Sequence, residues 1–158
     1  MERMTNESRL KSWIERYEAA HFLIGKRLDA MMREQLGGEL TIEQFSILRY
    51  MKRRGRTTST ELADAFCVGK SAITAIITRL VDKSLIARVQ DQEDRRVVYL
   101  ELTDEGYRIE EIADEKVQAN VGKYLATFPE DEIEGFMSCF ERLAALMVED
   151  SEGRGTHE

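Results

Sequence analysis

The order of apolar and polar positions predicts a mostly helical chain with one short β-hairpin. Over residues 8–36 apolar side chains recur every three or four positions, the spacing of one face of a helix. The same spacing returns over residues 104–126 and again from Pro129 to about residue 150. Three long amphipathic helices are therefore expected. In the last two, the side chains predicted to face inward are Ile109, Ile112, Ala113, Val117, Val121 and Tyr124, then Ile133, Phe136, Met137, Phe140, Leu143 and Met147.

Three shorter helices are predicted between the long ones. Thr41-x-x-Gln44 and Thr58-x-x-Glu61 have the form of capping boxes, which begin helices. The first of these helices is expected to end at Gly55 and the second near residue 66. A third, over residues 70–83, has an apolar stripe of Ile73, Ile76, Ile77 and Leu80, so its other side carries Ser71, Thr74, Ala75, Thr78 and Arg79.

After Ser84 the pattern changes to strands. Residues 85–90 and 97–102 are rich in β-branched and aromatic side chains, and a charged stretch separates them, which predicts a hairpin. Two short helices followed by a hairpin form a winged helix-turn-helix. The expected fold is mainly α with a small β-hairpin wing (α+β). Residues 39–103 are assigned to the winged helix-turn-helix domain, residues 1–38 and 104–150 to a helical dimerisation region, and residues 151–158 to a polar tail.

Charge is distributed unevenly along the chain, and this distribution reverses the conclusion drawn from the net charge alone. A net charge of −7 and an isoelectric point near 5.1 argue against a nucleic-acid partner. Residues 46–100, however, hold eleven basic and six acidic side chains, a net of +5, while the remainder of the chain sums to −12. The basic residues thus coincide with the predicted winged helix, which indicates binding to double-stranded DNA.

Residue types within this domain suit that role. A helix that enters the major groove needs short polar side chains near its start, as at Ser71 and Thr74, and Lys70 suits a phosphate oxygen. At the hairpin tip, Arg95 is the candidate for a narrow minor groove, and Asp94 is expected to hold an arginine by a bidentate ion pair.

A basic cluster at the end of the helix over residues 41–54 has two interpretations. It comprises Arg49, Lys52, Arg53, Arg54 and Arg56. Cations favour the C-terminus of a helix dipole, so the cluster is either a solvated helix end or a phosphate-binding surface. Arg53 and Arg56 are the phosphate candidates.

Four stretches also resemble the MarR family of bacterial transcriptional regulators: LTIEQFSILRYM, TSTELADAF, KSAITAIITRLVDKSLI and DQEDRRVVYLELTDEG. The resemblance implies a homodimer whose first and last helices interlock. It also implies minor-groove contact by Arg95, with Arg96 beside it in the wing, and major-groove contact by Ser71, Thr74, Thr78 and Arg79. The sequence departs from the family where Cys67 and Ser84 replace usual glycines and where Gly69 replaces a capping serine or threonine.

Sensing residues are less specific. Trp13, Tyr17 and His21 share a helix face that suits a small aromatic or anionic effector, or else His21 is a core or interface histidine. Cys67 is either a redox sensor or a small buried filler. Without a CxxC motif or a histidine cluster, neither a metal site nor a cofactor is expected. No apolar run is long enough to span a membrane, and a cytoplasmic protein is expected.

Three function classes are compared. A homodimeric repressor, bound to a palindromic operator and released by a small molecule or a redox signal, accounts for the basic middle and for apolar stripes that a domain of this size leaves uncovered. A winged-helix adaptor that binds protein is the alternative. An enzyme is not expected, because the sequence has no catalytic triad, phosphate-binding glycine loop or carboxylate-pair motif.

Overall fold

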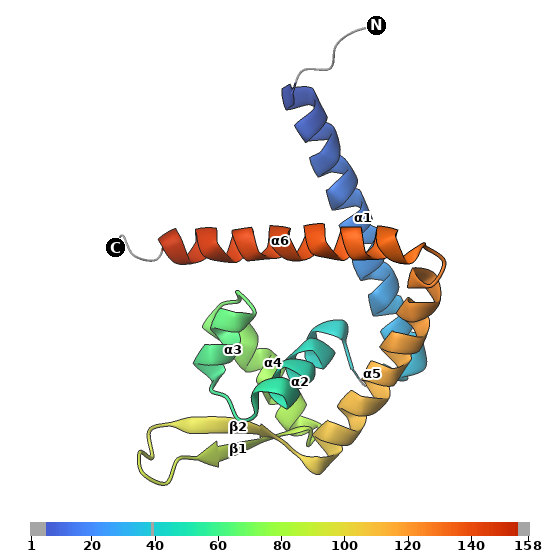
Figure 1. Cartoon of the computed structure of the whole chain (residues 1–158). Helices are drawn as coiled ribbons and strands as arrows, with labels where there is room; N and C mark the ends of the chain where they lie inside the picture. Colours follow the sequence, from blue (N-terminus) through green and yellow to red (C-terminus); the bar gives the residue numbers. More distant parts are fainter. Residues whose placement is uncertain (1–5, 39, 155–158) are drawn as a thin grey trace, which may run out of the picture. The chain divides into compact units, whose positions relative to one another are not determined.

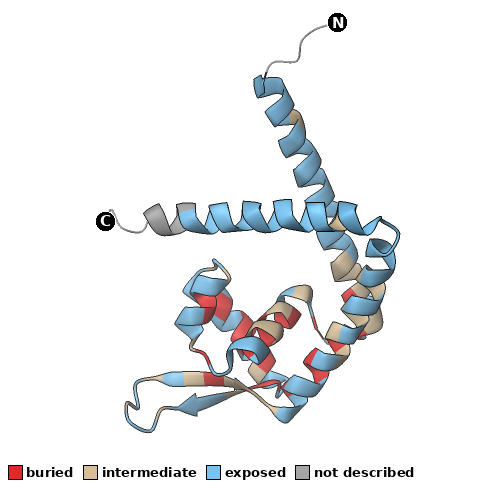
Figure 2. Ribbon diagram, in the orientation of Figure 1, coloured by how far each residue is buried: buried red, intermediate tan, exposed pale blue. Residues whose placement is uncertain are grey.

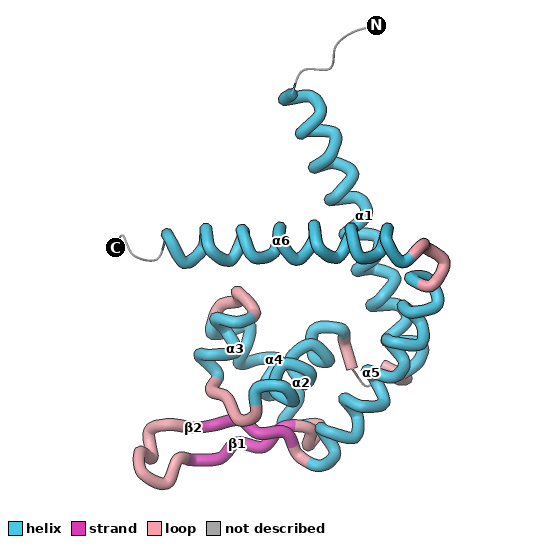
Figure 3. The backbone as a smooth tube through the Cα atoms, viewed as in Figure 1, coloured by secondary structure: helices cyan, strands magenta, loops and turns pink. Residues whose placement is uncertain are grey.

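The computed structural model describes residues 6–38 and 40–154, and it is mostly helical (Figure 1). The elements are α1 (Asn6–Gln35), α2 (Ile42–Arg54), α3 (Ser59–Ala65), α4 (Lys70–Asp82), β1 (Ile86–Gln90), β2 (Val98–Leu102), α5 (Asp104–Leu125) and α6 (Glu130–Arg154). The strands form one antiparallel two-stranded sheet, coloured separately from the helices in Figure 3. The expected fold class, a winged helix with additional long helices, is confirmed.

Both predicted capping boxes begin helices. The Gln44 amide donates to Thr41 Oγ1 at 3.2 Å, and the Thr41 amide donates in return to Gln44 Oε1 at 3.3 Å. Thr58 and Glu61 make the same reciprocal pair at the start of α3. Gly55 ends α2 with a φ of 82°, a conformation that side chains other than glycine rarely adopt.

The core of the winged helix forms from α2, α3, α4 and the base of the hairpin, as the buried residues in Figure 2 show. All four residues of the predicted α4 stripe are buried. Among the other fully buried side chains are Ile47, Leu48, Met51, Leu62, Ile86 and Leu100. The periodicity along α4 therefore identified its inner face correctly, which leaves the outer face free for a ligand.

The hairpin is fastened to this core at its base. Its register pairs Ile86 with Leu102 and Gln90 with Val98. Thr57, in the loop between α2 and α3, exchanges two backbone hydrogen bonds with Leu100 and so adds a short third strand position. The wing is thereby held in a fixed place beside the helix-turn-helix.

Thr103 and Gly106 shape the junction between the wing and α5. Thr103 Oγ1 accepts from the Gly106 amide at 2.9 Å, which caps α5, and donates to the Ser84 carbonyl at 2.6 Å. A Cβ on Gly106 would lie 2.1 Å from the carbonyl oxygen of Leu85. Glycine is needed here because two pieces of backbone approach closely.

The chain divides into two compact units, Met1–Lys116 and Val117–Glu158. The first contains α1, the winged helix and the first turns of α5, and the second contains the rest of α5 with α6. The predicted inward stripe of α6 is exposed in the single chain: Phe136, Met137, Phe140, Leu143 and Met147 are between 37% and 64% accessible. This exposure agrees with the expectation that the domain leaves these apolar stripes uncovered, and their burial in a homodimer stays a prediction. Tyr124, on α5, is likewise exposed.

The C-terminal end also differs from expectation. Helix α6 continues to Arg154, so residues 151–154 of the expected polar tail are helical. The last four tail residues, 155–158, and the first residue of the expected winged-helix range, residue 39, lie outside the described residues.

Candidate nucleic-acid interface

The outer face of α4 presents the side chains that the sequence assigned to the major groove. Lys70, Ser71, Thr74, Thr78 and Arg79 are all exposed, on the side opposite the buried stripe. The Thr74 hydroxyl donates to the carbonyl of Lys70 at 2.6 Å, so its lone pairs and methyl group remain for a partner. The structure thus brings this set together on one helix face.

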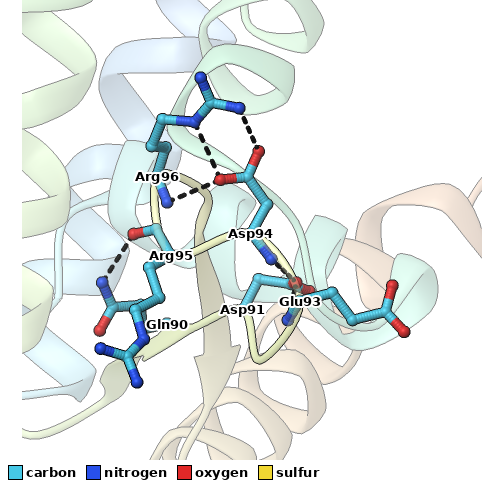
Figure 4. A network of polar contacts seen from close by, with 6 residues as sticks. All are labelled: Gln90, Asp91, Glu93, Asp94, Arg95 and Arg96. Carbon is cyan, nitrogen blue, oxygen red and sulfur yellow. Dashed lines mark hydrogen bonds and ion pairs between the residues drawn. The ribbon is translucent and has the colours of Figure 1, made fainter.

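The tip of the wing is ordered by its own polar contacts (Figure 4). The Asp91 carboxylate accepts from the amides of Glu93 and Asp94, each at 2.9 Å, and the Gln90 side-chain amide donates to the carbonyl of Arg95 at 2.6 Å. The hydrogen bonds from the Asp94 and Glu93 amides hold the pKa of the Asp91 carboxyl below its ordinary value. An ordered turn loses little further conformational entropy when it binds.

Asp94 holds Arg96 by the bidentate ion pair that the sequence predicted. Arg96 Nε and Nη2 lie 3.0 and 3.1 Å from the two carboxylate oxygens, and the Arg96 amide donates to Oδ1 at 3.0 Å. The Arg96 side chain, followed by its amide, lowers the pKa of Asp94. Figure 4 shows the Arg95 side chain directed away from Asp94, and Arg95 is exposed. At the wing tip, the guanidinium aimed outward is that of Arg95, whereas that of Arg96 is held by the turn.

The basic cluster after α2 separates into two groups. Arg53, Arg54 and Arg56 are exposed, and the Arg56 guanidinium lies 4.2 Å from the centroid of the Tyr99 ring on β2, which places it beside the wing. Arg49 and Lys52, in contrast, form ion pairs with Asp114 and Glu110 of α5.

These α5 contacts were missed by sequence reasoning. The cluster was interpreted either as a solvated helix end or as a phosphate-binding surface. Neither interpretation includes the ion pairs that Arg49 and Lys52 form with α5. The hydrogen bond to Glu110 raises the pKa of Lys52. A signal was present: Glu110 is four residues from Asp114 on the inner side of an amphipathic helix, where carboxylates need partners.

The proposed effector face lies on an exposed part of α1. Trp13, Tyr17 and His21 are exposed, and the rings of Tyr17 and His21 stack with centroids 5.7 Å apart. His21 is not a core residue of this chain, so its interface and effector interpretations stay open. Two surface hollows of about 260 and 270 Å³ occur elsewhere in the described part of the chain, and none of the three side chains lines them.

Cys67 is exposed and has a φ of 51°, so the interpretation as a small buried filler is wrong. The backbone turns there at the end of α3, where the chain needs a left-handed residue and places the side chain outside. Its redox role stays a prediction. Among residues 6–38 and 40–154, no cluster of three His, Cys, Asp or Glu side chains is arranged to hold a metal ion. No described helix is both long and apolar enough to cross a membrane.

Comparisons with known proteins agree with the fold. The model of the MarR family matches residues 40–98. The HTH-type transcriptional regulator YpoP of Bacillus subtilis is 30% identical over 118 residues, which cover 75% of this chain and 84% of YpoP. The repressor MdtR, also of Bacillus subtilis, is 37% identical over 95 residues, covering 60% and 61% of the two chains. A solved MarR family protein from Bacillus stearothermophilus has a TM-score of 0.77 at 26% identity, with 91% of this chain and 99% of that one covered. The chain belongs to the MarR family and is a DNA-binding transcriptional regulator.

Proposed function

We propose that this protein is a homodimeric repressor that binds a palindromic operator and is released by a small-molecule or redox signal. The observation that carries the proposal is that the two elements assigned to DNA contact belong to one compact unit and are fastened to each other. The exposed polar face of α4 and the wing that carries Arg95 belong to the same compact unit, Met1–Lys116, and the wing is fastened to the helix-turn-helix through Thr57 and Leu100. A relative, MdtR, is named a repressor.

Each element has a distinct role in this proposal. Helix α4 enters the major groove, where the short side chains of Ser71 and Thr74 let the backbone approach the base edges and Thr78 and Arg79 extend the contact. Arg95 enters the adjacent minor groove, because a narrow minor groove concentrates negative potential and attracts a guanidinium. Lys70, Arg53, Arg56 and Arg96 contribute to phosphate contact, which adds affinity without sequence preference.

Dimerisation accounts for the exposed apolar side chains outside the winged helix. In α6 these include Phe136 and Phe140, whose rings stack 5.5 Å apart, and in α1 they include Trp13 and Ile14. A second copy of the chain would remove these side chains from water. Two-fold symmetry would then place two α4 helices about one DNA turn, roughly 34 Å, apart and require a palindromic operator.

Release follows from a shift between two states of the dimer. A signal that binds or modifies one state more favourably than the other lowers operator affinity by that difference in free energy. The candidates are a small aromatic or anionic molecule at Trp13, Tyr17 and His21, and oxidation of the exposed thiol of Cys67.

Selection of bound sequences from random double-stranded DNA at physiological salt tests the proposal. Recovery of one palindrome with two equal half-sites is the expected result, and titration of operator complexes with aromatic acids and with peroxide then tests release. If no sequence is enriched, the repressor assignment fails and an adaptor that binds protein becomes the better account.

A further inference from the structure

Helices α2 and α5 are joined by two ion pairs that lie one helical turn apart. Arg49 Nη1 lies 3.1 Å from Asp114 Oδ1, and Lys52 Nζ lies 2.5 Å from Glu110 Oε2. The bases are three residues apart and the acids four, so each pair of like charges occupies successive turns of one helix face. The order is antiparallel, since the later base meets the earlier acid. We refer to these four residues as the α2–α5 clamp.

The clamp is built from partly and fully buried groups. The side chain of Glu110 is only 2% exposed and that of Asp114 is 22% exposed, while Arg49 and Lys52 are about one-third exposed. A carboxylate as buried as Glu110 is costly unless it is paired, and apolar residues in its place usually give equal or greater stability. A buried ion pair does, however, restrict two helices to one register, because other registers leave the charges unpaired.

The clamp lies in the first half of α5, a helix that the two compact units share. Helix α5 begins at Asp104, against the wing, and continues beyond Lys116 into the second compact unit. Within the first unit, the Lys116 ammonium also donates to the carbonyl of Gln35 at the end of α1. The first turns of α5 are therefore held on α2 and on α1, while its last turns belong to the unit whose apolar side chains are exposed.

We infer that Glu110 and Asp114 are positioning residues that set the separation of operator half-sites. They hold α2, and with it α4, in one orientation on α5, so that dimerisation through the outer helices presents the two α4 helices at one fixed spacing. This inference rests on the proposed homodimeric DNA binding. It assigns to Arg49 and Lys52 a role in spacing selectivity instead of direct phosphate contact.

The test compares operator affinities as the half-site spacing changes. One base pair inserted at the centre of the selected palindrome rotates one half-site by about 35° and moves it by about 3.4 Å. The full-length variants are the neutral pair K52Q/E110Q, the inverted pair K52E/E110K, the single variant E110Q, and E115Q as a control. Glu115 lies on the exposed side of the same helix.

The measured quantity is the ratio of the Kd for the lengthened operator to the Kd for the selected one. Wild type and E115Q are expected to prefer the selected spacing by at least about tenfold. The neutral pair should reduce this preference to below about threefold while unfolding cooperatively on heating, and the inverted pair should restore it. Loss of stability alone would lower affinity for both operators and leave the ratio unchanged. The neutral pair leaves no unpaired buried charge, so the test remains decisive if the inverted pair does not fold.

Two outcomes overturn the spacing role. In the first, the neutral pair retains the full preference of wild type. In the second, E110Q strengthens binding to all DNA alike and steepens its salt dependence by about one unit, which would show that the carboxylate only withholds Lys52 from phosphate. If wild type itself selects no palindrome, the proposed function fails and the spacing role fails with it. If wild type selects a palindrome but its spacing preference survives in the neutral pair, only the spacing role fails.

Discussion

The winged helix and the helix α6 differ in how far their apolar side chains are buried. In the unit Met1–Lys116, side chains such as Ile47, Leu48 and Leu62 are completely inaccessible. In the unit Val117–Glu158, large side chains such as Tyr124 and Met147 are each 64% exposed. The winged helix has its core within one chain, whereas the apolar side chains of α6, like Trp13 and Phe22 of α1, are exposed. A face of this kind is stable in water mainly when another surface covers it.

Their charges differ in the same sense. Residues 46–100 have a net charge of +5, and residues 117–158 hold three basic and nine acidic side chains, a net of −6. Phosphates attract the first region and repel the second. The difference supports the proposal that the first region contacts DNA and the second joins two copies of the chain.

Carboxylates placed on the apolar face of α6 test whether this face joins two copies of the chain. The double variant F136E/F140E replaces two stacked, exposed rings with carboxylates that an interface would have to desolvate. The protein is expected to become monomeric at micromolar concentration and to lose about a thousandfold or more in affinity for a palindromic operator. Sedimentation equilibrium gives the mass, and fluorescence anisotropy gives the affinity.

Ser138 provides the matched control for α6. It lies near the side of the helix opposite Phe136 and Phe140 by helical periodicity, and it is exposed. S138E should stay dimeric and bind the operator as wild type does. If both variants dissociated to the same extent, or if both remained dimeric, the apolar face would not be the surface that joins the two copies.

Substitution of Gly106 tests whether the winged helix depends on close packing within its own chain. A Cβ at this position would lie 2.1 Å from the Leu85 carbonyl oxygen, which cannot move without displacing the base of the wing. G106A is expected to lower the free energy of unfolding by about 3 kcal/mol, as for severe overpacking. Chemical denaturation followed by circular dichroism measures it.

Gly122 lies in the same helix, and a Cβ added there would meet no described atom within 4 Å. G122A should therefore stabilise α5, by about 0.5–1 kcal/mol, because alanine is the better helix former. If both alanines had the same effect, the close approach at Gly106 would not be the reason for its glycine.

Local patterns predicted most of the winged helix. The capping boxes at Thr41 and Thr58 begin α2 and α3, and the apolar spacing of α4 identified both its buried and its exposed face. These features depend on side chains within four residues of one another, so the linear sequence contains them. The ion pair of Asp94 with Arg96 was predictable for the same reason, since its members are two residues apart.

Contacts between distant segments were not predictable in this way. The ion pair of Lys52 with Glu110 joins positions 58 residues apart, and only the fold shows that they meet. Periodicity also marked Phe136 and Phe140 as apolar but gave no information on what covers them. An amphipathic pattern shows which side of a helix avoids water, and it does not distinguish its own chain from a second copy.

Substitution of Arg95 tests whether the wing contacts a DNA groove. The Arg95 side chain is exposed at an ordered tip, so its truncation would remove the proposed groove contact without disturbing the Asp94–Arg96 pair. R95A is expected to weaken specific binding by about 1–3 kcal/mol at fixed salt. As a control, R53A should weaken binding to all sequences alike and make the salt dependence shallower by about one unit. An unchanged operator affinity for R95A would show that the wing does not read the groove.

The two departures from family glycines should show a smaller effect within the same unit. Cys67 has a φ of 51° and Ser84 a φ of 58°, so both occupy the left-handed region that favours glycine. C67G and S84G are each expected to raise the free energy of unfolding by up to about 1 kcal/mol, through relief of backbone strain that is offset in part by unfolded-state entropy. Cys139, exposed within helix α6, is the contrast, because C139G should destabilise. Destabilisation by all three would contradict the strain at residues 67 and 84.

The smallest expected effect concerns acid and the wing tip. Arg96 holds the pKa of Asp94 below its ordinary value of 3.8. Because the folded pKa is the lower one, the ion pair contributes its full stability at a pH well above the ordinary pKa, and this stability is lost as the pH falls through the lowered value. The tip should therefore keep its shape, without DNA and without a second chain, throughout the neutral range. Carboxyl carbon shifts of Asp94, followed by NMR during acid titration, should give a lower midpoint in wild type than in R96A. Identical midpoints would mean that Arg96 does not hold Asp94 in solution.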